Sequence, residues 1–315
     1  MTPEASGRPS RRRRYTRQQS ETVLALTARK LRLLGFVGRY RLLSLPQAAA
    51  LAGLSEKAAR RHLRGLFDHG LVDVIAAPRA ALADPAEPDD ARLLYGSAPN
   101  LYRLTRAGLK VLQSAELAED IRLTPDRYGP RHTLFLAHEL AIRDLLIWFE
   151  LAARTHPGHR LECWRAGGEA LIDLQRARSP KLCHPDAWLV YRIDERALVA
   201  LVEVDRGTER GGRKWGQKVA AYEELFQGGR LPDVTGYGRA RILTVTPDER
   251  RRDRLAKFVG EHAPEWLAKR FWFADHTILE VPDLYQIAWR QSTVPQLQLL
   301  LAPELLPEAT DPQGG

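Results

Sequence analysis

The sequence predicts a protein of mixed α/β (α+β) class with two domains. An N-terminal winged helix-turn-helix is expected to precede a mixed sheet flanked by helices. The chain has 315 residues, about the length of two ordinary domains. Two short helical segments joined by a tight, glycine-containing turn lie in its first quarter, as in a helix-turn-helix. Helical and strand-like segments then mix in the second half, which is typical of helices packed on a sheet.

Composition excludes several classes of protein. The chain is 44% hydrophobic and 28% charged, which is ordinary for a globular protein. We find no apolar run of the roughly 18 residues that a membrane helix requires, and no signal peptide. Cys163 and Cys183 are too few and too far apart for a disulfide framework or a CxxC-type zinc site. We therefore expect a cytoplasmic protein without a membrane partner.

Positive charge is concentrated at the N-terminus. The net charge is +9, and residues 1–17 hold six arginines but one acid, Glu4. Residues 1–19 are predicted to be a disordered basic arm, and residues 303–315 a disordered tail, because neither segment can bury a core. The arm is either a solubilising tail or a set of cations that neutralise DNA phosphates. Its predicted DNA contacts are Arg11, Arg12, Arg13 and Arg14.

A winged helix is expected over residues 20–122. Ser44 or Leu45 caps a short second helix that Gly53 stops, and Ser55 caps a third helix that ends at Gly70. Thr105 caps a later helix. The expected elements are helices over 23–37, 47–52 and 55–69, strands over 71–75 and 101–104 around a long loop, and a helix over 106–118.

The third helix carries the predicted DNA-reading surface. Ala59, Leu63 and Leu66 share one face and are expected in the core. The opposite face carries four cations: Lys57, Arg60, Arg61 and Arg64. A helix of this kind can lie in the major groove of DNA. The alternative is a protein-binding winged helix with a solvated basic face.

The second domain is expected over residues 130–290. Its predicted elements are a helix over 134–153, strands over 161–165, 187–193 and 197–204, a helix over 213–226, a strand over 240–245, a helix over 248–262 and a strand over 269–273. Asp186 begins one strand, while Glu203 and Asp205 end the next on one face. Such acids can hold a hard cation, or they can form a structural ion-pair network.

Three short phrases carry a resemblance to a known family: Cys183–Ala187, Glu203–Glu209 and Lys218–Tyr222. In this order and spacing they resemble the replication-relaxation family of plasmid and mobile-element proteins. The resemblance covers the layout of about residues 20–275. It implies that the second domain is restriction-endonuclease-like, similar to the PD-(D/E)xK nucleases.

The nuclease pattern implies roles for particular residues. Asp186 and Glu203 would be the metal ligands, with Asp205 as a third acid, and Mg²⁺ or Mn²⁺ the ion of an active enzyme. The pattern's lysine is absent, because Asp205 stands there; Lys218, on the following helix, would replace it. On the first helix Glu139 completes the catalytic set Asp186, Glu203, Lys218 and Glu139. His138 is an alternative there, although we interpret it as a satisfied core histidine.

Three functions stay open at this stage. The first is duplex DNA binding by a plasmid or mobile-element protein that acts in replication, relaxation or its control. The second is a metal-dependent DNA nuclease, and the third is a transcriptional regulator whose nuclease-like domain is inactive. The expected partner is double-stranded DNA; replication or relaxosome proteins and a second copy in a homodimer are further candidates.

Overall fold

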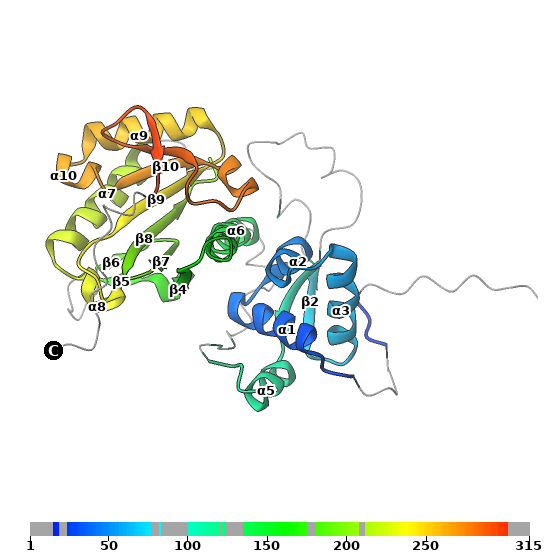
Figure 1. Cartoon of the computed structure of the whole chain (residues 1–315). Coiled ribbons are helices and arrows are strands. Elements are labelled where there is room, and N and C mark those ends of the chain that lie inside the picture. Colours follow the sequence, from blue (N-terminus) through cyan, green and yellow to red (C-terminus); the bar gives the residue numbers. More distant parts are fainter. Residues whose placement is uncertain are drawn as a thin grey trace, which may run out of the picture. The chain divides into compact units, whose positions relative to one another are not determined.

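The computed structural model divides into two compact units. The first holds the described residues up to 76 and from 100 to 123, and the second holds residue 82 and those from 135 to 301 (Figure 1). The described residues are 15–18, 24–76, 82, 100–119, 121, 123, 135–174, 181–207 and 212–301. The predictions for Arg11 to Arg14, for the tail 303–315 and for most of the loop before residue 100 lie outside them.

The first unit is a winged helix, as the sequence predicted. Its elements are α1 (Ala28–Tyr40), β1 (Leu43–Ser44), α2 (Leu45–Ala52), α3 (Glu56–Asp68), β2 (Val72–Ala76), β3 (Asn100–Leu104) and α5 (Arg106–Ser114). The strands form an antiparallel sheet in the order β1-β3-β2. The strand β1, which the sequence did not predict, joins the helix-turn-helix to the two wing strands.

Local capping explains where these helices begin and end. Ser44 caps α2 in a capping box with Gln47, and Gly53 ends α2 in the left-handed conformation at φ 63°. The side chains of Ser55 and Thr105 accept backbone hydrogen bonds at the starts of α3 and α5. The sequence predicted Gly53, Ser55 and Thr105 at these positions and left the cap of α2 open between Ser44 and Leu45.

The second unit is a seven-stranded mixed sheet with helices on both faces. Its elements are α6 (Leu136–Ala153), β4 (His159–Ala166), the 3-10 helix η3 (Gly167–Ala170), β5 (Ile172–Asp173), β6 (Leu182–Cys183), β7 (Ala187–Ile193), β8 (Arg196–Val204), α7 (Gly212–Gln227), α8 (Leu231–Thr235), β9 (Arg241–Thr246), α9 (Glu249–His262), α10 (Glu265–Ala268), β10 (Phe271–Asp275), the 3-10 helix η4 (His276–Glu280), β11 (Ile287–Gln291) and β12 (Leu297–Leu299). The strand order is β12-β11-β10-β9-β8-β7-β4, with β8, β9 and β10 parallel. Helix α6 covers one face, and α7 and α9 cover the other (Figure 1).

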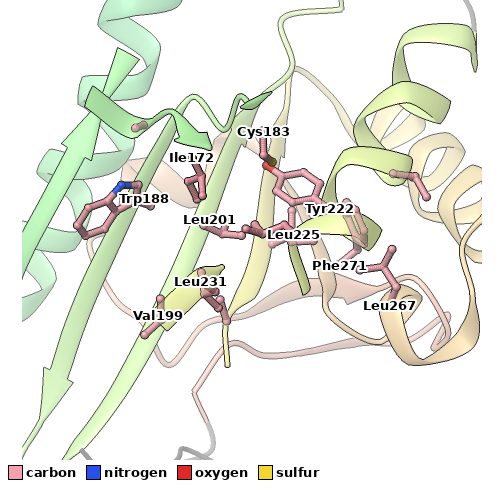
Figure 2. Close-up of a cluster of buried hydrophobic side chains, with 14 of the residues drawn as sticks. Ile172, Cys183, Trp188, Val199, Leu201, Tyr222, Leu225, Leu231, Leu267 and Phe271 are labelled. Carbon is pink, nitrogen blue, oxygen red and sulfur yellow. The ribbon is translucent and has the colours of Figure 1, made fainter. Parts of the chain in front are cut away.

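One hydrophobic core of this unit lies between the sheet and α7, α9 and α10. Figure 2 shows Leu201 of β8, Tyr222 and Leu225 of α7 and Phe271 of β10 packed together. Strand β8 is buried on both faces from Ala197 to Val204, which explains its continuous apolar run. The sequence did not predict the strands β11 and β12, which carry the sheet on to Leu299. No helix among the described residues is long and apolar enough to cross a membrane.

Candidate functional site

The exposed face of α3 carries three of the four predicted cations. Lys57, Arg60 and Arg61 are exposed, while the side chains of Ala59, Leu63 and Leu66 are fully buried. Arg60 has one exposed partner, Glu56, at 3.9 Å. An exposed pair of this kind holds a side chain weakly, so Arg60 can exchange it for another anion.

Further cations lie beside this face. Burial lowers the pKa of His62 on α3, and the charges of Arg61, Lys30 and Arg29 lower it further. Arg29 and Lys30 belong to the first turn of α1. Arg29 and Lys30 therefore lie within electrostatic reach of α3. They belong to the basic stretch 29–67 of the sequence, although neither was among the predicted DNA contacts.

Arg64, the fourth predicted cation, makes contacts within the protein. Its guanidinium pairs with Asp68 at 2.9 Å and donates a hydrogen bond of 2.8 Å to the carbonyl of Thr16. It also lies over the ring of Phe67, 5.4 Å from the ring centre. With 20% of its side chain exposed, Arg64 is less open to solvent than the other three.

The predicted catalytic acids meet at one edge of the large sheet. Asp186 directly precedes β7 and Glu203 lies near the end of β8, and these strands are antiparallel neighbours with Ala187 opposite Val202. The carboxylate of Asp186 accepts a 2.7 Å hydrogen bond from the backbone N–H of Val204. The pairing of two consecutive strands is therefore enough to bring the two acids together.

Glu203 is buried and bound to α7. Its side chain is 1% exposed, and it accepts hydrogen bonds from the Lys218 ammonium at 2.7 Å and from the Tyr222 hydroxyl. Burial raises the pKa of Glu203 to about 7; the charge of Lys218 opposes this shift and that of Asp186 adds to it. Burial and the charge of Glu203 raise the pKa of Tyr222 well above its usual value.

Helix α6 brings two further groups to the same place. The Nε2 atom of His138 lies 2.9 Å from Oδ1 of Asp186, and the histidine side chain is 31% exposed. The interpretation of His138 as a core histidine is therefore wrong: Asp186 binds it at the edge of the sheet. Burial by itself would lower the pKa of His138, and so would the charge of Lys218. The hydrogen bond to Asp186 and the charges of Asp186 and Glu139 outweigh these effects, so the pKa is raised.

Glu139 lies within electrostatic reach of this group and has its own partner. Arg143, one helical turn later, donates a 2.7 Å hydrogen bond to its carboxylate. A Cβ atom at Gly167, where φ is 60°, would lie 3.8 Å from this carboxylate. The structure thus gathers Glu139, Asp186, Glu203 and Lys218, with His138 added, and these five residues are called the acid cluster below.

Asp205 lies on the same side of the sheet as Glu203 but has different partners. Arg251, in the first turn of α9, holds its carboxylate with bonds of 2.8 and 2.7 Å, and the N–H of Gly207 donates a third of 2.7 Å. These described partners all lie outside the acid cluster. No local signal in the sequence could have revealed this, because Arg251 lies 46 residues further along the chain.

The donor types at the acid cluster fit a hard divalent ion. Mg²⁺ is commonly held by one or two carboxylates and completes its shell with water, so Asp186 and Glu203 would suffice. All four of their carboxylate oxygens are hydrogen-bonded to protein groups: His138, Val204, Lys218 and Tyr222. Within the described part of the chain, no group of three or more His, Cys, Asp or Glu residues is arranged to hold a metal. Each oxygen keeps a second lone pair, so an ion would share these oxygens with the groups that already bond them.

Comparison with known proteins decides the family. The model of the replication-relaxation family matches residues 34–239, which is more than half of the chain. The chain therefore belongs to the replication-relaxation family. The matched segment runs from the middle of α1 to the end of α8, so it contains both the helix-turn-helix and the acid cluster. Family membership and the winged-helix fold together support a DNA-binding role in replication.

Other comparisons add little to the family assignment. No curated protein matches this replication-relaxation protein. A solved structure, a MarR family transcriptional regulator from Silicibacter pomeroyi DSS, is similar at 21% sequence identity with a TM-score of 0.21. The similarity covers 38% of this chain and 69% of the regulator.

Proposed function

We propose that the protein binds duplex DNA through its winged helix and acts in the replication of a plasmid or mobile element, in the cytoplasm. The observation that carries this proposal is the face of α3 opposite its core. Lys57, Arg60 and Arg61 are exposed there on a helix whose other face is anchored by fully buried residues. A rigid helix with an exposed cationic stripe has the form of a major-groove reader.

The surroundings of α3 fit the same proposal. Arg29 and Lys30 extend the positive surface onto α1, where they would contact phosphates beside the groove. Phosphate contacts position a protein on DNA, while contacts to base edges select the sequence. The stripe on α3 would therefore supply selectivity, and α1 would supply affinity.

A triple substitution tests this function. Lys57→Ala, Arg60→Ala and Arg61→Ala together should abolish selective binding to the cognate duplex, measured by mobility shift and fluorescence anisotropy. The slope of log affinity against log salt should fall by about 0.9 for each of these cations that also meets a phosphate, and by less for one that contacts only a base edge. The fold should survive, because Ala59, Leu63 and Leu66 are unchanged.

A matched control removes the same charge elsewhere. Arg154, Lys257 and Lys269 are exposed cations of the second unit, each paired with a glutamate one helical turn away. Their combined replacement by alanine should leave the selectivity for the cognate duplex intact. Equal affinity of the α3 variant and the wild type would overturn the proposed function.

A second candidate function is a metal-dependent DNA nuclease. It is favoured by the convergence of Asp186, Glu203 and Lys218, which lie on three separate elements in the pattern that the nuclease resemblance implies. In that role Asp186 and Glu203 would hold Mg²⁺ or Mn²⁺, and Lys218 would orient water beside the scissile phosphate. The ion would supply charge stabilisation at the phosphate and a more acidic water. Binding without cleavage would instead leave a replication or transcription regulator.

A further inference from the structure

The described N-terminal segment is tied to the end of α3. The Nε atom of Arg17 donates a 3.0 Å hydrogen bond to the carbonyl of Phe67, and its guanidinium pairs with Asp73 of β2. The backbone N–H of Gln18 donates a 3.0 Å hydrogen bond to the carboxylate of Asp68. Residues 15–18 are therefore held by both backbone and side-chain contacts.

Arg64 completes this attachment from the side of the helix. Its Nε donates a 2.9 Å hydrogen bond to Asp68, and its terminal nitrogen donates one of 2.8 Å to the Thr16 carbonyl. The guanidinium groups of Arg64 and Arg17 both lie over the ring of Phe67, at 5.4 and 5.1 Å from its centre. Cation–π contacts of this kind add to the hydrogen bonds. We call Arg17, Arg64, Phe67, Asp68 and Asp73 the clamp.

The clamp lies at the end of the proposed DNA-reading stripe. Arg64 follows Arg60 by four residues and Arg61 by three, so it shares their face of the helix. Thr16 is therefore fixed at the end of this stripe. In the sequence, Arg11 to Arg14 precede Thr16 by two to five residues.

We infer that Arg64 is a positioning residue: the clamp ties the N-terminal arm to the recognition helix, so that arm and helix engage one stretch of DNA as a single interface. This inference rests on the proposed DNA binding. Tethering raises the effective concentration of the arm's arginines at the phosphates beside the groove that α3 reads. Arg64 itself contributes through Thr16 and Asp68 and makes no base contact.

The geometry of arginine is central to this role. A guanidinium can bond a carboxylate and a carbonyl at once in a fixed plane, whereas the ammonium of lysine acts as a point charge. Arg64→Lys therefore keeps the charge but loses the fork that joins Asp68 to Thr16. A residue whose work was to neutralise a phosphate would tolerate this change.

A double-mutant cycle tests the inference in the full chain. Three variants are compared with wild type for binding to the same duplex: deletion of residues 1–14, Arg17→Ala/Arg64→Ala, and both changes together. We expect the deletion to weaken binding about tenfold, since several phosphate contacts are lost. The clamp variant Arg17→Ala/Arg64→Ala should lose nearly as much affinity. Combining it with the deletion should weaken binding by less than twofold beyond the deletion alone. Independent losses that multiply would overturn the inference.

Further variants separate positioning from direct contact and from misfolding. Arg64→Lys should behave like Arg64→Ala in the presence of the arm; full affinity for Arg64→Lys would identify a direct phosphate contact and refute the clamp. Asp68→Asn leaves both arginines in place and should also reduce the effect of deleting the arm. Arg106→Ala, an exposed cation on α5, is the charge-matched control and should leave that effect unchanged. The α3 triple variant tests the proposed function separately: if it binds DNA like the wild type, the proposed function is rejected. The clamp test requires only that the wild type binds DNA.

Discussion

Lys218 on α7 and Glu203 on β8 form a 2.7 Å ion pair in which the glutamate side chain is buried and the lysine side chain is 28% exposed. The buried partner thus receives its compensating charge from a helix that lies after the strand in the chain. Tyr222, one turn further along α7, bonds the other carboxylate oxygen of Glu203. This pair joins the sheet to α7, and it also makes the acid cluster a candidate for catalysis.

The first prediction concerns the nuclease candidate. Wild-type protein should nick supercoiled plasmid in the presence of Mn²⁺ or Mg²⁺, and EDTA should stop the reaction. Asp186→Asn should eliminate the nicking and leave DNA binding unchanged, because the winged helix is a separate compact unit. Nicking that persists in Asp186→Asn would assign the activity to other residues, and its absence from the wild type would reject the candidate.

The second prediction separates Asp205 from the acid cluster. Asp205→Asn should preserve any nicking but destabilise the protein, because Arg251, whose side chain is 11% exposed, loses its charged partner. Breaking a buried pair in this way costs about 3 kcal/mol. Urea unfolding measures the loss, and Asp205→Asn/Arg251→Met should recover part of it. A variant as stable as wild type would contradict the observed pairing.

The third prediction is a pH dependence of stability. The pKa of Glu203 is about 7 in the folded protein against an ordinary value of 4.5, so between these values the folded state holds a proton that the unfolded state has lost. Stability should therefore fall as the pH rises from 4.5 to 7. The raised pKa of His138 acts in the same direction. Protonated His138 contributes to the stability of the folded protein below pH 6.5, the ordinary pKa of histidine, and this contribution is lost as the pH rises through the pKa that His138 has in the folded protein.

Glu203→Gln isolates the glutamate's part of this effect. The variant should show a flatter curve of melting temperature against pH between about 5 and 8, because the proton that the folded state retains on Glu203 is no longer there to be lost. Glu195→Gln, at an exposed position, is the control and should keep the wild-type slope. An unchanged slope in Glu203→Gln would show that other groups cause the dependence.

The fourth prediction compares two helical glycines of the winged helix. A Cβ atom at Gly108 in α5 would lie 2.2 Å from the backbone oxygen of Leu71, which is itself fixed by hydrogen bonds from Thr105. Gly108→Ala should therefore lower stability by about 2 to 3 kcal/mol. Gly35→Ala in α1 meets nothing within 4 Å and should be neutral or stabilising by about 0.5–1 kcal/mol. Thermal melting measures both, and equal melting temperatures would contradict the packing.

The sequence determined most of the secondary structure by itself. Ser44, Gly53, Ser55 and Thr105 set helix boundaries because capping depends on groups only a few residues apart. The continuous apolar run of β8 indicated a strand buried on both faces for a similarly local reason. The strands β1, β5, β6, β11 and β12 were not predicted, because short strands are stabilised chiefly by pairing with distant partners.

The sequence also indicated that Asp186 and Glu203 would meet, because they lie at the paired ends of neighbouring strands. Only the tertiary structure decided the partner of each side chain. Glu203 and Asp205 are two residues apart, yet Lys218 of α7 binds one and Arg251 of α9 binds the other. Arg64 shares a helical stripe with Arg60 and Arg61, yet its guanidinium holds Thr16, 48 residues away. A periodic pattern specifies the face on which a side chain lies, but the partner that it meets depends on which distant element the packing brings to that face.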